Sequence, residues 1–354
     1  MKHLTIRNLG PLTDVSIDIG QVNIIIGMQS SGKSCVLKTA CFCTWVEKRL
    51  QLAQRPNGFG NGSGFIDTMA HYYGMVGYIK ADTYVAYETD YLRFSYDHSL
   101  RQFDFQWKPD RWLYRRPKLS YVPADRNLVA SIPGWSSLKL DDDMLDFMAD
   151  WDCARRFMKR AENILDLGIA YEYDEASNTD IIITPTGQRL SLSSSSSGLQ
   201  SLVPQFVHLD YMFKGQYRNV NKSLSYEKKM EQEYLLSLLK NDEVFHRFVA
   251  TDHCEIFLEE PEGNLFPPTQ FQLMDWILEM MADANHRNVI FVATHSPYVL
   301  NHLLQENLSD FRLMLTYPLA DGLFGVKTAT DEDIQGIYDN GSDAFFNFEP
   351  FIAQ

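Results

Sequence analysis

The chain has 354 residues, of which 45% are hydrophobic and 13% aromatic, so it can bury one large core or two lobes and is not wholly disordered. Its formal net charge of −14 argues against a generally basic surface for nucleic acid, although a local basic patch stays open. No apolar run approaches the roughly 20 residues that span a bilayer, and the N-terminus lacks a signal-peptide core, so we expect a cytoplasmic protein with no membrane partner.

The first fifty residues are typical of strands followed by a helix. Short strands are expected at 4–7 and 15–19, a buried β-branched strand at 22–26, and a helix from Ser34 to about Leu50. The chain has five cysteines, an odd number that cannot all pair in disulfides, and they lack the spacing of zinc ligands, so reduced and mostly buried thiols are expected.

The segment between this strand and this helix, Gly27–Ser34, reads G-x-x-x-x-G-K-S, a complete phosphate loop in the required strand–loop–helix context. Its glycines let the backbone wrap around phosphates, while amides and the helix N-terminus supply partial positive charge. Lys33 would reach the β- and γ-phosphates, and the Ser34 hydroxyl would ligate Mg²⁺. The sequence therefore predicts binding of a nucleoside triphosphate by Gly27, Gln29, Ser30, Ser31, Gly32, Lys33, Ser34 and Cys35.

The middle of the chain changes composition. A flexible loop is expected at 55–64, antiparallel strands between about 70 and 124, a helical block at 141–167, a hairpin at 171–192 turning at 175–178, and helices at 199–213 and 226–250. The last hundred residues return to alternation, with strands at 256–258, 289–293 and 311–315 and a helix at 269–284. Internal repeats and sustained heptads are absent.

Two strand ends in this last part carry candidate chemistry. A buried strand ends in Glu259 and Glu260, which is how many phosphate-loop NTPases hold Mg²⁺ with one acid and activate water with the next. The strand at 289–293 delivers His295 to the edge where ligands of open α/β sheets bind, so its imidazole could contact the γ-phosphate or orient water. Taken alone, the acids could be solvated charges and the histidine a helix cap, but the order of the segments favours a nucleotide site.

In this order the segments resemble the ABC-type ATPase heads of the RecF, SMC and overcoming-lysogenisation-defect (OLD) proteins. Gly27–Ser34 stands as Walker A, Ile256–Glu260 as Walker B and Thr294–Ser296 as the switch-histidine segment. E-E-P-E at 259–262 is most similar to the OLD-type pattern E-E-P-E-x-x-L-H-P, from which Phe266 departs, so Phe266 receives no catalytic role. The segment Y-V-P-A-D-R ending at Arg126 is also similar to defence-type ATPases, without indicating what Arg126 does.

The resemblance is strong over 1–50 and 250–305 and thin between them. It implies an α/β fold, an ABC-type P-loop head whose nucleotide-binding lobe of mixed sheet spans 1–50 plus 250–354, with an inserted α+β lobe at 51–249. It also implies a signature segment in that insert, for which Ser196, Ser197 and Gly198 are the candidates, contacting the γ-phosphate of a second protomer. The alternative is that the serine run at 193–197 is a flexible linker.

The implied reaction is Mg²⁺-dependent ATP hydrolysis in a homodimer or higher oligomer, with Glu260, His295 and Lys33 as catalytic residues and Ser34 and Glu259 as metal ligands. OLD-type nucleases carry a toprim domain after the ATPase, for which this chain has no room. The favoured role is therefore the sensor of a bacterial antiphage or toxin–antitoxin-like system, controlling a separate nuclease or toxin. A RecF-like DNA-repair ATPase and a weakly hydrolysing scaffold remain alternatives.

Three basic clusters and an aromatic tail complete the candidates. The clusters comprise Lys108, Arg111, Arg115, Arg116 and Lys118 beside Trp107, Trp112 and Tyr114; Arg155, Arg156, Lys159 and Arg160; and Lys214, Arg218, Lys222, Lys228 and Lys229. They could track a nucleic-acid backbone, or they could be solvated faces, which is the more frequent case. The tail at 345–351 could dock a partner or complete the sheet.

Overall fold

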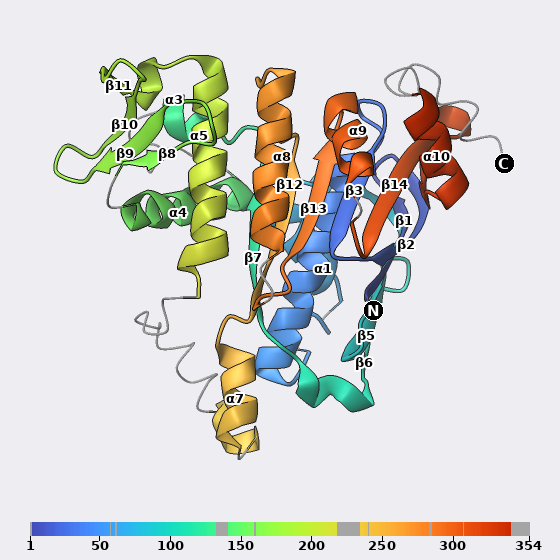
Figure 1. The fold of residues 1–354 in the computed structure, drawn as a ribbon. Helices are drawn as coiled ribbons and strands as arrows, with labels where there is room; N and C mark the ends of the chain where they lie inside the picture. Colours follow the sequence, from blue (N-terminus) through green and yellow to red (C-terminus); the bar gives the residue numbers. More distant parts are fainter. Residues whose placement is uncertain are drawn as a thin grey trace.

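The computed structural model describes residues 2–56, 58–60, 62–131, 141–158, 161–217, 234–239, 241–282, 285–306 and 308–340. Within these ranges the chain forms an eleven-stranded mixed sheet and a four-stranded antiparallel sheet, covered by helices (Figure 1). The predicted mixed α/β fold class is confirmed.

The large sheet has the strand order β6-β5-β4-β1-β2-β15-β14-β3-β13-β12-β7. Its strands are β1(Lys2–Leu9), β2(Leu12–Ile19), β3(Val22–Ile26), β4(Ile79–Glu88), β5(Leu92–Asp97), β6(Gln102–Trp107), β7(Pro117–Val122), β12(His253–Glu259), β13(Val289–Thr294), β14(Phe311–Pro318) and β15(Phe324–Thr328). The five strands from β14 to β7 pair in parallel. The sheet is antiparallel from β6 to β2.

Strand β3 lies between two hydrophobic cores. All five of its residues are buried, as expected for a parallel strand covered on both faces. Because neighbouring side chains of a strand point to opposite faces, Ile25 joins a core with α1(Lys33–Ala53) and α2(Gly64–Tyr72). Ile24 and Ile26 join the other core, formed with α4(Asp142–Phe157), α5(Ser197–Asp210), α8(Pro267–Met281) and α9(Pro297–Gln305).

The small sheet has the order β11-β10-β9-β8 and lies with α4 and α5 at one end of the molecule, at the upper left of Figure 1. Its strands are β8(Glu162–Asn163), β9(Ala170–Asp174), β10(Thr179–Ile183) and β11(Arg189–Ser191). The predicted hairpin is confirmed, because β9 and β10 pair antiparallel on either side of the turn at 175–178, with Asn178 at φ 50°.

The remaining elements are short connections and one terminal helix. They are η1(Val76–Tyr78), η2(Pro109–Leu113), α3(Leu128–Ser131), η4(Leu192–Ser194), the π-helical turn η5(Tyr211–Gly215), α7(Asp242–Val249), η6(Ala320–Gly322) and α10(Asp331–Asn340). In the described part of the chain, no helix combines the length and apolar character that crossing a membrane requires.

Four predicted elements differ from the structure. Of the antiparallel strands expected between about 70 and 124, β4 to β6 pair antiparallel, whereas β7 pairs in parallel with β12. The glycine-rich stretch expected to be a loop up to residue 64 gives way to α2, which starts at Gly64. The helix expected at 141–167 ends at Phe157, and the rest of that stretch forms β8 and a turn with positive φ at Leu165 and Gly168. Of the helix expected at 226–250, residues 234–239 and α7 are helical, while 226–233 lie outside the described residues, as does the tail at 345–351.

The predicted inserted lobe at 51–249 contributes strands to both sheets. Strands β4 to β7 belong to it by number and yet lie in the large sheet. The boundary at residue 50 therefore falls between strands of one continuous sheet, and the two-lobe division stays a prediction. All five cysteines are free thiols as expected, four of them buried and Cys153 exposed.

Candidate functional site

Three neighbouring strands deliver the predicted site residues to one edge of the sheet. Strand β13 lies between β3 and β12, and all three run parallel. The phosphate loop follows β3, His295 follows β13, and Glu259 and Glu260 stand at the end of β12. Since carboxyl ends of parallel strands meet at the same edge, sequence segments more than two hundred residues apart form a single site.

The phosphate loop is packed so tightly that two of its glycines have no room for a side chain. A Cβ on Gly27 would lie 1.7 Å from Oγ1 of Thr316, a residue of β14. Gly32, at φ 93°, would place a Cβ 2.6 Å from Cδ2 of Leu12. Ser31 is fully buried and its Oγ accepts a hydrogen bond from Thr316 Oγ1 at 2.6 Å. Thr316 is thus a loop-supporting residue that no motif announces.

Lys33, the first residue of α1, folds its ammonium group back over the loop. Its Nζ donates to the carbonyl oxygens of Gly27 at 2.9 Å and Met28 at 2.6 Å. Burial lowers the pKa of Lys33 to about 8, and the nearby carboxylates of Glu260 and Glu262 oppose that shift. The loop cation therefore lies within the field of the acids at the end of β12.

The other predicted nucleotide contacts divide into exposed and buried side chains. Gln29, Ser30 and Ser34 are exposed along the loop, and Ser30 has a φ of 59°. Cys35 points into the core, where its Sγ lies 3.8 Å from the carbonyl oxygen of Leu9 and burial raises the thiol pKa to about 12. A contact between Cys35 and a nucleotide would accordingly come from the backbone.

Glu259 offers a carboxylate oxygen suited to a metal ion. The residue is 8% exposed, and its Oε2 accepts a hydrogen bond from the Ala124 amide at 3.3 Å. Its Oε1 is buried and has no hydrogen-bond partner among the described residues. A buried orphan oxygen of this kind, together with the exposed hydroxyl of Ser34, matches the hard oxygen donors that Mg²⁺ prefers. The predicted ligand pair therefore fits the ion.

Glu260 is held in an unusual backbone conformation with its carboxylate against His295. Its φ is 43°, a region that side chains rarely adopt, and its amide donates to the Ala293 carbonyl at 2.8 Å. One carboxylate oxygen lies 3.1 Å from His295 Nε2. That hydrogen bond, helped by the charges of His295, Lys33 and Arg126, lowers the pKa of Glu260 although burial opposes it. The carboxylate is therefore ionised at neutral pH and able to accept a proton.

His295 is fixed from both its backbone and its ring. Its amide donates to a carboxylate oxygen of Glu262 at 2.7 Å, while its imidazole meets Glu260. The structure thus places the predicted switch histidine, His295, in hydrogen-bond contact with the predicted base, Glu260. A direct contact between His295 and a phosphate stays a prediction.

Arg126, whose role the sequence left open, is a buried side chain that hydrogen-bonds the backbone of Glu259 and Glu260 and so acts as a brace for this site. Its guanidinium donates to the carbonyl oxygens of Pro123 at 3.3 Å, Glu259 at 2.9 Å and Glu260 at 2.8 Å. The side chain is fully buried, and burial lowers its pKa to about 10 against the opposing charges of the neighbouring glutamates. The sequence signals were its place shortly after a strand and the resemblance of its segment to defence-type ATPases, neither of which indicates its partners Glu259 and Glu260, which lie more than 130 residues away.

The candidate signature segment forms a helix N-terminus, as expected. Ser196 caps α5, and its Oγ accepts a bond from the Leu199 amide at 3.4 Å. In the next turn, Ser201 Oγ donates to the Gly263 carbonyl at 2.8 Å, which ties α5 to the loop after Glu260. The contact of Ser196, Ser197 and Gly198 with a second protomer's nucleotide stays a prediction.

Several members of the basic clusters are already paired within the chain. Arg115 meets Asp252 at 2.8 Å, Lys118 meets Asp150 at 2.6 Å, and Lys108 meets Glu88 at 2.6 Å. Arg155 and Arg156 both pair with Asp152, and Lys214 pairs with Asp210. Lys159, Arg160, Arg218, Lys222, Lys228 and Lys229 lie outside the described residues. Nucleic-acid contact stays a prediction that these ion pairs do not favour.

No protein-family model and no curated protein sequence matches this chain. Among solved structures, the SMC head domain from Thermotoga maritima is 12% identical, covers 93% of this chain and 98% of its own, and has a TM-score of 0.45. An Smc head domain derived from Pyrococcus furiosus, bound to the C-terminal domain of ScpA, is 9% identical over 96% and 99% with a TM-score of 0.45. The ADP conformation of an ATP-binding cassette of an ABC transporter is 13% identical over 100% of both chains with a TM-score of 0.36. At this distance the similarity does not bear on chemistry, which rests on the site itself.

Proposed function

We propose that this chain is an ABC-type ATPase head that binds Mg²⁺-ATP in the Gly27–Ser34 loop and hydrolyses it. The observation that supports this most strongly is the pairing of the ionised Glu260 carboxylate with His295, in electrostatic contact with Lys33 across the edge of the sheet. A charged loop lysine facing an oriented carboxylate is the arrangement that phosphoryl transfer to water needs.

Each side chain has a distinct task in this reaction. Lys33 exchanges its bonds to the loop carbonyls for bonds to phosphate oxygens and stabilises the charge that develops there. Glu260 accepts the proton of the attacking water, and His295 holds the carboxylate in place. Ser34 and Glu259 would hold Mg²⁺, which supplies charge neutralisation at the phosphates when bound.

The active site is proposed to be completed by a second copy of the chain. Ser196, Ser197 and Gly198 lie at the N-terminus of α5, where free amides and the helix dipole favour an anion. Ser197 is exposed, so it is accessible to a partner. A homodimer with ATP between its two protomers would place this turn of one copy on the γ-phosphate of the other.

The biological role follows from the resemblance of E-E-P-E at 259–262 to the OLD-type pattern. We assign the chain to a bacterial antiphage or toxin–antitoxin-like system, as a sensor that controls a separately encoded nuclease or toxin. A RecF-like DNA-repair ATPase is the alternative, and it predicts ATP-dependent binding to gapped DNA that weakens steeply with salt.

The mass of the Glu260→Gln protein, measured by light scattering with and without Mg²⁺-ATP, tests the proposal. Slow hydrolysis should trap an ATP-dependent dimer, and Ser197→Arg should prevent it because a bulky side chain then blocks the turn. Glu243→Gln, an exposed change on α7, is the matched control and should behave as wild type.

The other outcomes separate the alternatives. If the protein is an oligomer whose mass ATP does not change, and if Glu260→Gln does not alter turnover, the chain is a nucleotide-binding scaffold and not an ATPase switch. If the protein hydrolyses ATP and stays monomeric, a second protomer is not needed for the reaction.

A further inference from the structure

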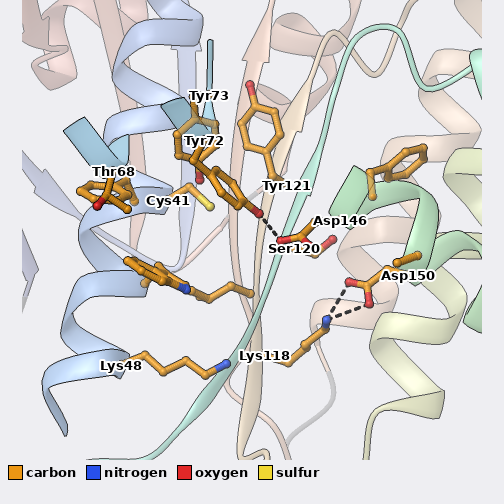
Figure 2. Close-up of a pocket in the computed structure, with 15 residues that line it drawn as sticks. Cys41, Lys48, Thr68, Tyr72, Tyr73, Lys118, Ser120, Tyr121, Asp146 and Asp150 are labelled. Carbon is orange, nitrogen blue, oxygen red and sulfur yellow. Dashed lines mark hydrogen bonds and ion pairs between the residues drawn. The ribbon is translucent and has the colours of Figure 1, made fainter. Parts of the chain in front are cut away.

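A cavity of about 300 Å³ lies beside β7, at a place distinct from the phosphate loop. Helices α1 and α2 form one wall and α4 forms the opposite wall, as Figure 2 shows. Neither the loop at 27–34 nor the acids at 259–260 line it. The cavity therefore belongs to no part of the proposed reaction.

Aromatic rings cover one part of the cavity. Trp45 of α1, Tyr72 and Tyr73 at the end of α2, and Tyr121 of β7 all line it. The rings are held by one another, with the Tyr72 and Tyr73 centroids 4.7 Å apart in an edge-to-face contact and those of Tyr73 and Tyr121 5.4 Å apart. Fixed aromatic faces of this kind are suited to a planar or apolar group.

Charged groups of both signs line the other part. Lys48 of α1, Lys118 of β7, and Asp146 and Asp150 of α4 line this part, and Figure 2 shows Lys48 extending toward β7 and Lys118 extending toward Asp150. Lys118 pairs with Asp150 at 2.6 Å, and the Tyr72 hydroxyl donates to Asp146. The Lys118 and Asp150 side chains are 26% and 24% exposed, so both reach the accessible space of the cavity, and a ligand would replace their pair with bonds of its own.

This pattern selects the charge and size of a ligand. A phosphate group would be repelled by the two aspartates, and a simple cation by the two lysines. A zwitterion satisfies both sets. The volume lies at the lower end of the ~300–1,000 Å³ that ligand pockets span, which favours an amino acid over a nucleotide.

We propose that this cavity binds a free aromatic amino acid. Its carboxylate would face Lys48 and Lys118, its ammonium group would face Asp146 and Asp150, and its ring would lie among the tyrosines and Trp45. A residue at the end of a peptide carries only one of the two charges, so the free amino acid is the better match.

A bound amino acid would join elements that lead to the nucleotide site. Helix α1 begins at Lys33, and α4 packs against α5, whose N-terminus carries the signature turn. The two walls are already linked by Lys38 and Asp143, 3.4 Å apart. Tyr121 also connects the cavity with the nucleotide site, because its ring lines the cavity and its hydroxyl neighbours the Glu259 carboxylate. Binding of the amino acid should therefore change ATP turnover. This coupling rests on the proposed ATPase function, whereas the proposed binding of the amino acid does not.

Calorimetric titration of the full-length protein with three related probes tests the binding. L-tryptophan should bind at one site, and at least tenfold more tightly than indole-3-propionate, which lacks the ammonium group, or tryptamine, which lacks the carboxylate. Equal affinity for the three probes, or no saturable binding of L-tryptophan up to millimolar concentration, would overturn the proposal.

Variants locate the site. Ala149→Trp fills the cavity from an exposed lining position of α4 and should lower the affinity for L-tryptophan at least tenfold. Leu145→Trp, exposed on the same helix but away from the lining, is the matched control and should bind as wild type. Wild-type affinity in Ala149→Trp would place the ligand elsewhere and refute the site. Should that variant fail to fold, the three-probe comparison on the wild-type protein decides.

ATP turnover with and without L-tryptophan separates the two proposals. A change in wild type that Ala149→Trp abolishes supports the coupling, and unchanged turnover despite binding refutes it. A wild-type protein that binds L-tryptophan but never hydrolyses ATP refutes the proposed function and leaves the amino-acid site standing.

Discussion

Replacing Arg126 by methionine should damage catalysis far more than stability. The guanidinium holds the carbonyl oxygens of Glu259 and Glu260 at 2.9 Å and 2.8 Å, and Glu260 sits at a φ of 43° that few side chains adopt. Without the brace, the strained residue is free to relax toward a common conformation and to move its carboxylate away from the attacking water. Arg126 is thus a positioning residue for the proposed base.

Two opposing terms keep the stability effect small. Hydrogen bonds from a charged donor contribute about 1.5–3 kcal/mol each, so losing the two short bonds to Glu259 and Glu260 costs about 3–6 kcal/mol, and the longer bond to Pro123 at 3.3 Å adds less. Against this, burial lowers the pKa of Arg126 from 12.5 to about 10, which at ~1.4 kcal/mol per pH unit means that removing the buried charge returns about 3.5 kcal/mol. The unfolding free energy should therefore fall by no more than about 3 kcal/mol. Turnover should fall by about 100-fold, the lower range of what a positioned general base supplies.

Urea denaturation and steady-state ATP turnover, measured on the same preparations, check this split. Arg126→Lys keeps the charge but not the fork of donors and should recover stability more than turnover. Arg7→Met, at an exposed arginine 3.3 Å from Asp14, is the control and should change neither quantity measurably. Turnover of Arg126→Met within twofold of wild type would refute the positioning role.

Two further predictions follow from titrating groups. Because burial lowers the pKa of Lys33 to about 8, the ATP dissociation constant should be constant below about pH 7 and should rise toward tenfold per pH unit above pH 8. Titration of wild type and Lys33→Met with a fluorescent nucleotide checks this. A dissociation constant of the wild type that does not change with pH would contradict it. Burial also raises the pKa of Glu47 from 4.5 to about 7 although Thr89 donates to it at 2.7 Å. The folded protein then holds a proton that the unfolded chain releases, so Glu47 lowers the unfolding free energy by about 3 kcal/mol as pH rises from 4.5 to 7. Denaturation at pH 5 and pH 8 should show Glu47→Gln gaining stability over wild type by that amount at the higher pH, and equal differences at both pH values would refute the assignment.

The strands and motifs around the nucleotide site could be predicted because their signals are local. The buried run of β3, the glycines behind it and the start of α1 are contiguous, so hydrophobic pattern and turn chemistry agree. The α2 helix was missed because the glycines before it, ending at Gly64, indicate a loop, while its burial comes from tertiary contacts of Phe65 and Ile66. Helix α4 is shorter than predicted because no glycine or proline marks its end at Phe157, and the first such residue after it is Gly168.

The contacts that orient the proposed catalytic groups are not visible in such local signals. Arg126 and Glu259 are 133 residues apart, and Thr316 and Ser31 are 285 apart, so neither pair leaves a periodicity or a spacing in the sequence. The amino-acid cavity is hidden for the same reason. Its charges come from α1, β7 and α4, which meet only when the large sheet has formed. A basic cluster containing Lys118 left nucleic-acid contact open beside the more frequent case of a solvated face, and the structure pairs that lysine with Asp150.

The loop after Glu260 explains how the candidate signature helix and the candidate base depend on one another. The Glu260 carbonyl accepts bonds from Arg126 and from the Gly263 amide at 3.0 Å, and the Gly263 carbonyl accepts from Ser201 of α5 at 2.8 Å. A shift of α5 therefore pulls on Gly263, and through it on the strained backbone that aims the Glu260 carboxylate. Because α5 also presents Ser196–Gly198, the proposed docking of a second protomer on that turn would be coupled mechanically to the alignment of the proposed base within the first.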